Sequence, residues 1–193
     1  MVAAMNTVDS HIQALEMTDA VERRYAETEL MRLGRTALVA LVDALASATL
    51  RQQVVILKLL GKMGDTAALP TLKHALLDPQ WLIRQAAVNA LANFQADSVL
   101  PMIFHALYDH ALLVRLEAIM ALGRLRHASA VPTLLTHLNS TESDVETYTI
   151  VEALGLCGDR SVAATLEPYM YHENAQVRQR TLEALSRLTG TTR

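Results

Sequence analysis

The sequence predicts an all-α fold, an α-solenoid in which about six helix pairs stack into a superhelix. The first observation is an internal repeat. The segment ALPTLKHALLD from Ala68 returns as VLPMIFHALYD from Val99, and it returns again at the same interval as AVPTLLTHLNS from Ala130. The second is the composition, since 51% of the 193 residues are apolar but only 4% are aromatic. A unit this short cannot bury its own apolar face, so its copies must stack.

The same register continues at both ends of the chain. Moving back from Ala68 by the same interval gives ALVALVDALAS from Ala37, and moving forward from Ala130 by an interval one residue longer gives VAATLEPYMYH from Val162. A more polar unit, with the segment VERRYAETELMRLG, precedes them and matches if Arg23 aligns with Arg84. We therefore predict one domain over residues 1–193, divided into a capping repeat at 6–34 and repeats at 35–65, 66–97, 98–128, 129–159 and 160–190.

Each unit is predicted to begin with a short helix. A proline stands at the same place in three units, where a helix starts and a missing N–H costs nothing: Pro70, Pro101 and Pro132. A serine just before the first helix is predicted to be its N-cap in three units: Ser98, Ser129 and Ser161.

A second helix follows in each unit. In the third unit its apolar positions recur at i, i+4, i+7, i+8 and i+11, which is one stripe of a 3.6-residue helix: Ile83, Ala87, Ala90, Leu91 and Phe94. The extra residue in the last interval is assigned to the turn STESDVET, which places Glu146 where the preceding unit has Val114. We expect that unit to be locally irregular.

An arginine follows the first core residue of the second helix in three units: Arg84, Arg115 and Arg178. Helix pairs with this arginine resemble HEAT repeats. The ALxxL helices and the tails LGKMGD and LGLCGD are most similar to the HEAT-like repeats of the phycobilisome lyase family. The resemblance covers nearly the whole chain. It implies the fold, and it suggests a protein that handles open-chain tetrapyrroles or phycobiliprotein subunits, often as a heterodimer.

In HEAT arrays the second helices line the concave side, so their outward positions are the candidate site. A solvated face should be mostly charged, yet the middle of this one is largely apolar and contains the chain's single tryptophan. We predict a partner-binding groove from these residues: Leu50, Val54, Trp81, Gln85, Leu112, Leu116, Met120 and Tyr148.

Two neighbouring rows receive a structural interpretation. The flanking apolar row is interpreted as packing between repeats: Leu57, Val88, Ile119, Val151 and Leu182. A row of small residues permits close approach of helices: Gly61, Ala92, Gly123, Gly155 and Ser186. The repeated arginines admit a phosphate-binding reading, but we favour hydrogen bonds to turn carbonyls or carboxylates.

No catalytic, cofactor-binding or metal-binding residues are predicted. His74 and His105 are one repeat apart, too far to share an ion. The pair His172-Glu173 is similar to the iron-holding pairs of the HEAT-repeat deoxyhypusine hydroxylases, but it occurs once, so we reject that activity. Cys157 aligns with core positions and is interpreted as a small buried hydrophobe rather than a nucleophile or bilin-attachment thiol.

Composition and charge restrict the partners. With 17 basic and 20 acidic residues the formal charge is −3, which favours neither nucleic acid nor an anionic membrane. The chain shows no secretory leader, no apolar run of about 18 residues and a single cysteine, so a cytoplasmic location is expected.

Three functions remain open. The first is a non-catalytic scaffold or adaptor that holds a helix or extended segment of another protein in the concave groove. The alternative is a phycobilin lyase subunit, or a phycobilisome assembly or degradation factor, that binds a bilin or a phycobiliprotein. The third is a structural subunit whose groove closes on itself in a homodimer. None of the three requires a cofactor.

Overall fold

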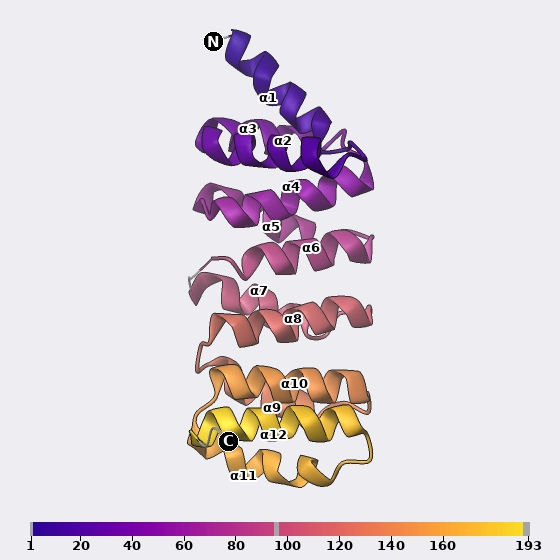
Figure 1. The fold of residues 1–193 in the computed structure, drawn as a ribbon, viewed down its shortest axis with the longest axis vertical. Helices are drawn as coiled ribbons and strands as arrows, with labels where there is room; N and C mark the ends of the chain where they lie inside the picture. Colours follow the sequence, from indigo (N-terminus) through magenta and orange to yellow (C-terminus); the bar gives the residue numbers. More distant parts are fainter. Residues whose placement is uncertain (1, 95–96, 191–193) are drawn as a thin grey trace. The chain divides into compact units, whose positions relative to one another are not determined.

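The computed structural model describes residues 2–94 and 97–190. Throughout these residues the secondary structure is helical, without a strand, which confirms the all-α prediction. The chain forms two compact units, Met1–Phe94 and Gln95–Arg193. In each unit, pairs of antiparallel helices follow one another along the chain (Figure 1).

Unit 1 contains six α-helices and one 3₁₀ turn among its described residues. They are α1 (Val2–Ala14), α2 (Ala20–Leu33), α3 (Arg35–Ala44), α4 (Leu50–Met63), η1 (Thr66–Ala68), α5 (Leu69–Ala75) and α6 (Trp81–Leu91). The second helices α4 and α6 pack side by side, and the first helix α5 packs against α6. Helix α1 begins at Val2, ahead of the predicted start of the capping repeat.

Unit 2 continues the same pattern within residues 97–190. Its elements are η2 (Asp97–Val99), α7 (Leu100–Ala106), α8 (Leu112–Leu125), α9 (Ala130–Ser140), α10 (Asp144–Cys157), η3 (Arg160–Val162), α11 (Ala163–Leu166), η4 (Glu167–Tyr171) and α12 (Ala175–Thr189). The second helices α8, α10 and α12 pack in this order, with α9 against α10 and α11 against α12.

The local signals for helix starts are partly as predicted. Pro70 and Pro101 lie in the first turn of α5 and α7. Two of the three serine caps are wrong, because Ser98 and Ser161 lie inside 3₁₀ turns. Ser129 is the N-cap residue of α9 as predicted, but its side chain makes no capping hydrogen bond. Two aspartates take that role one turn earlier: Asp65 accepts from Ala67 N at 2.9 Å, and Asp159 accepts from Ser161 N at 2.8 Å.

The irregular unit lies where the spacing predicts it. The second helices start at Leu50, Trp81 and Leu112 with a constant interval, whereas the next starts at Asp144, one residue beyond that interval. The first helix of that unit, α9, has 11 residues against 7 in α5 and α7. The inserted residue is therefore absorbed between α9 and α10, as expected.

Small residues bring successive second helices into close contact. A Cβ atom added to Gly61 of α4 would lie 2.5 Å from Ala90 Cα of α6. One added to Gly155 of α10 would lie 2.7 Å from Ala184 Cβ of α12. Real Cβ atoms do not come this close, so the backbones approach to a distance that only glycine permits. The small-residue row is thus a packing device.

The flanking apolar row is also packed. Its first four members are fully buried: Leu57, Val88, Ile119 and Val151. Only Leu182, on α12, is exposed. Because this row is buried between neighbouring second helices, the residues available to a partner are those of the outward row beside it, which contains Leu50, Trp81 and Leu112.

Replacing Gly61 or Gly155 by alanine should lower the free energy of unfolding by about 1–3 kcal/mol, because the added methyl group overlaps the neighbouring backbone. This loss must exceed the gain of about 1 kcal/mol that Gly→Ala brings to a helix interior. Urea denaturation followed by circular dichroism measures the difference.

A control is available at an exposed position of the same helix as Gly61. Lys58→Ala places an alanine on the solvent side of α4 and should stay within about 0.5 kcal/mol of the wild-type value. If Gly61→Ala and Gly155→Ala stabilise the protein as Gly→Ala does in a free helix, the close approach of the helices is wrong.

Candidate functional site

In unit 1, four predicted groove residues lie on the exposed side of α4 and α6. Leu50 and Trp81 are the first residues of these helices, and 37% and 39% of their surfaces are exposed. Val54 and Gln85 lie one turn further along and are half-buried. The i, i+4 spacing places each pair on one face of its helix, so the four side chains lie beside one another.

In unit 2, the other four predicted residues lie on α8 and α10. Leu112 and Met120 of α8 are 37% and 42% exposed, while Leu116 of α8 and Tyr148 of α10 are half-buried. Sequence reasoning left out Leu113, which is 45% exposed on the same helix. Its position directly after Leu112, on the edge of the outward face, was the available signal. Helix α8 therefore exposes a mainly apolar face.

Several other large exposed apolar side chains stand apart from these faces. Val39 lies on α3, Leu77 follows α5, and Tyr108 and Tyr171 lie at the ends of first helices in unit 2. Single apolar residues on a surface are ordinary in soluble proteins. Exposed apolar residues also occur on the second helices α2, α4, α6 and α8, where Val21 and Tyr25 lie one turn apart on α2.

The repeated arginines hold turns together. Arg84 donates from Nη1 to the carbonyl oxygens of Asp78 and Pro79 at 2.8 and 3.0 Å, and it is only 5% exposed. Arg115 and Arg178 make the same pair of bonds to the turns that precede their helices. The structural interpretation of these arginines is confirmed.

The same contact identifies the repeat at the amino end. Arg23 donates to Met17 O at 3.2 Å, which reproduces the contact of Arg84 with Asp78 O six residues before it. The alignment of Arg23 with Arg84 is therefore correct.

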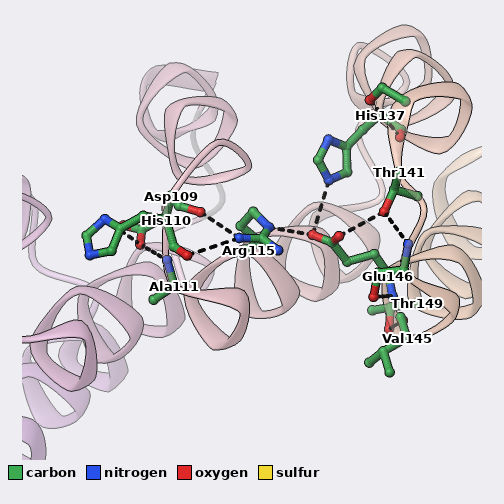
Figure 2. A network of polar contacts seen from close by, with 11 residues as sticks. Asp109, His110, Ala111, Arg115, His137, Thr141, Val145, Glu146 and Thr149 are labelled. Carbon is green, nitrogen blue, oxygen red and sulfur yellow. Dashed lines mark hydrogen bonds and ion pairs between the residues drawn. The ribbon is translucent and has the colours of Figure 1, made fainter.

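Unit 2 contains a buried polar network around Glu146 (Figure 2). The Glu146 carboxylate is 4% exposed, accepts from Arg115 Nε at 2.5 Å and accepts from Thr141 Oγ1 at 2.8 Å. His137 Nε2 lies 3.5 Å from the same carboxylate, and Tyr108 packs edge-on against the His137 ring. The network joins α8, α9 and α10.

The chemistry of this network is structural. Burial alone would raise the pKa of Glu146, but the hydrogen bonds from Arg115 and Thr141, together with the charges of Arg115 and His137, outweigh burial and lower it. The carboxylate therefore stays ionised and is occupied on both oxygens. It occupies the core position that Val114 fills in the preceding repeat, so its partners replace apolar packing.

The remaining reactive residues also have structural surroundings. Burial raises the pKa of the Cys157 thiol to about 11, as expected for a small core residue rather than a nucleophile. His172 Nδ1 accepts from Asn174 N at 3.1 Å, where the equivalent turns use Asp78 and Asp109. Within residues 2–94 and 97–190, no three histidine, cysteine, aspartate or glutamate side chains are grouped to hold a metal ion.

One feature of unit 1 was not predicted. A surface cavity of about 530 Å³ opens between α3 and α5, with Leu57 and Ile83 among the lining residues and His74 and Asp78 beside them. Gln53, which aligns with the turn-binding arginines, also lines it and donates to Leu45 O at 3.0 Å. The cavity lies on the side of the first helices.

Comparison with known proteins decides the family. The family profile described as HEAT repeats matches residues 36–111 and 75–148, which together span more than half of the chain. The chain belongs to the HEAT-repeat family. No curated protein matches it.

Solved structures of helical proteins show a similar fold. A chain from the complex of CpcE and CpcF of phycocyanin lyase from Nostoc sp. PCC7120 is 21% identical, with a TM-score of 0.59 over 95% of this chain and 65% of that chain. An engineered protein is 18% identical, with a TM-score of 0.54 over 95% and 96%. A designed armadillo repeat protein is 16% identical, with a TM-score of 0.52 over 94% and 99%.

These matches confirm the all-α solenoid and the predicted similarity to the lyase-type HEAT repeats at the level of the fold. The chain spans just under two thirds of the lyase chain that it matches. No helix in the described part of the HEAT array is long and apolar enough to cross a membrane.

The Glu146 network gives a pH-dependent prediction. Glu146→Gln removes the ion pair with Arg115 and should lower the free energy of unfolding at pH 7 by about 1–3 kcal/mol. Because the pKa of Glu146 is lowered in the folded state, its contribution is complete above the unfolded pKa and is lost as the pH falls through the folded value. Urea denaturation at several pH values between 7 and 3 should show the two proteins converging.

Glu142→Gln is the matched control, since Glu142 lies in the same turn but is exposed. It should change the free energy of unfolding by less than about 0.5 kcal/mol. A gap between Glu146→Gln and wild type that stays constant down to pH 3 would contradict the assigned ion pair.

Proposed function

We propose that this chain is a non-catalytic, cytoplasmic scaffold that holds a segment of another protein against the outward, concave-side face of its second helices. The observation that carries the proposal is the apolar face of α8, with Leu112, Leu113 and Met120 exposed. An apolar side chain at a binding surface gains free energy when a partner removes it from water. The corresponding face of unit 1 contributes Leu50 and Trp81.

Two further findings support a binding role over catalysis. The arginines that a catalytic or phosphate-binding reading would use are engaged by turn carbonyls. The buried carboxylate of Glu146 has both oxygens occupied by Arg115 and Thr141. The exposed apolar side chains of the second helices, by contrast, can contact a partner without disturbing the packing of the repeats.

A bilin-handling lyase subunit is the second candidate, and its support is the similarity to a chain of the CpcE–CpcF complex. The geometry is less favourable to it. Arg84 is buried and bound to its turn, so it does not offer a guanidinium to a propionate group. Mixing the protein with phycocyanobilin tests this candidate, because Trp81 is the chain's only tryptophan and its emission reports on a ligand bound beside it.

Selection from a phage-displayed library of random peptides tests the scaffold function without a known partner. Wild-type protein should enrich peptides that bind with micromolar or better affinity. Trp81→Ser should lose the peptides that bind unit 1, and Leu112→Ser with Met120→Ser should lose those that bind unit 2, each by tenfold or more, because central aromatic and aliphatic anchors dominate such interfaces.

Leu77→Ser and Val39→Ser are the controls, since both remove an exposed apolar side chain from the first-helix side. They should retain all enriched peptides. Circular dichroism should show wild-type helical content for every variant, while Trp81→Ser and the double variant unfold at a lower urea concentration because part of each replaced side chain is buried. Enriched peptides that bind the groove variants as tightly as the wild type would refute the proposed face. If phycocyanobilin, but no peptide, depends on Trp81, the lyase candidate replaces the scaffold.

A further inference from the structure

The exposed charges on helices α4 and α6 of unit 1 are all of one sign. Helix α4 has the sequence LRQQVVILKLLGKM, with three basic residues and no acidic one. The only charged residue of α6 is Arg84, which is buried against its turn. The outward face made by these two helices therefore contains cations and no carboxylate of its own.

Two of these cations are unpaired. Arg51 and Lys58 are exposed, and no ion pair among the described residues involves either of them. They are separated by two helical turns, so they lie on the same side of α4 about 10 Å from one another. The third, Lys62, lies 3.6 Å from Glu27 of α2 and is partly neutralised.

The cations flank the apolar part of the same face. On α4, Leu50 and Val54 lie at i and i+4, next to the line through Arg51 and Lys58. Trp81 begins the neighbouring helix α6 at the position that Leu50 has on α4. A partner that buries Leu50 and Trp81 therefore also covers Arg51 and Lys58. These cations lose water contacts on binding, which is unfavourable unless the partner supplies negative charge.

The cations Arg51 and Lys58 have no basic counterpart on α8 or α10 of unit 2. Leu113 and Val145 stand at the position of Arg51, and Met120 and Glu152 stand at the position of Lys58. Repeat packing therefore does not require cations here. The net charge of the chain is −3, so the basic face also runs against the overall charge.

We propose that the α4–α6 face of unit 1 binds an acidic segment of a partner protein, in which an apolar side chain is flanked by two carboxylates. The apolar side chain contacts Leu50 and Trp81, and the carboxylates pair with Arg51 and Lys58. The separation of about 10 Å corresponds to about three residues of an extended segment or about seven of a helix. The inference rests on the proposed function and names the partner class for one of its two faces.

A nucleic acid fits this face less well. Nucleic-acid binding usually relies on many phosphate contacts, whereas only two unpaired cations lie here beside aliphatic side chains. The acidic protein segment uses both the cations and the apolar residues.

The composition of selected peptides is the first test. From the random library, peptides whose binding requires Trp81 should contain Asp or Glu at about twice the library frequency or more, together with a large apolar residue. Trp81-dependent peptides with no acidic excess would overturn this inference and leave the scaffold function standing. If all selected peptides depend on Leu112 and Met120 and none depends on Trp81, this inference is likewise overturned and the scaffold function stands.

Charge reversal is the second test. Arg51→Glu with Lys58→Glu should weaken binding of a selected acidic peptide by tenfold or more at about 50 mM salt, and by less at about 500 mM, because salt screens exposed charges. The same variant should bind a lysine-substituted form of the peptide more tightly than the wild type does. Fluorescence anisotropy of labelled peptide measures both affinities.

Lys73→Glu is the control, since Lys73 is exposed on the first helix α5 and has the same charge. It should leave peptide affinity within twofold of the wild type. Equal weakening by Lys73→Glu would reduce the effect to overall charge and overturn the inference. Tighter binding of a labelled single-stranded RNA than of any acidic peptide, or sedimentation that shows Trp81-dependent dimers, would also overturn it.

Discussion

The close approach of neighbouring second helices is the constraint on which the rest of the structure depends. The backbones approach more closely than a Cβ atom at the glycine position would permit, both where Gly61 faces Ala90 and where Gly155 faces Ala184. At that distance the flanking apolar row is buried between neighbouring second helices, as the full burial of Leu57 and Val88 shows. The next row around the helix is then the first that can reach a partner. If the helices were further apart, the flanking apolar row would also be exposed, and packing residues could not be told apart from binding residues by their burial.

Most of the fold could be predicted from the sequence, because a residue that recurs at the same position of several repeats is assigned the same role in each of them. The arginines at Arg84, Arg115 and Arg178 recur with the period, and each makes the same bonds to its turn. The helix caps do not benefit in this way. Serine and aspartate are equally good caps, so Ser161 was chosen where Asp159 serves, and only the position of the 3₁₀ turn distinguishes them.

The candidate face was predictable where helical periodicity alone decides exposure, as for Trp81 and Met120. The Glu146 network was not. Alignment placed Glu146 in a core position, but its partners come from the previous repeat and from the turn before it, through Arg115 and Thr141. The sequence does place Glu146 one repeat after Arg115. Whether these two side chains point toward one another depends on how neighbouring repeats pack, which the sequence pattern does not give.

Positions where the repeats disagree are the informative ones for binding. Packing requires the small-residue row and the buried apolar row, which recur in most repeats. The turn arginine recurs in four of the six repeats and is replaced by Gln53 and Thr147 in the others. No such requirement acts on the outward row, which is basic beside Leu50 in unit 1 and acidic at Asp144 in unit 2. The acidic residues of unit 2 already have partners, since Asp144 accepts from Asn174 and Glu152 pairs with Arg180, whereas Arg51 and Lys58 of unit 1 have none among the described residues. Under the proposed function, the charge of a partner segment therefore matters most at unit 1, while the same helix packing supports the outward rows of both units.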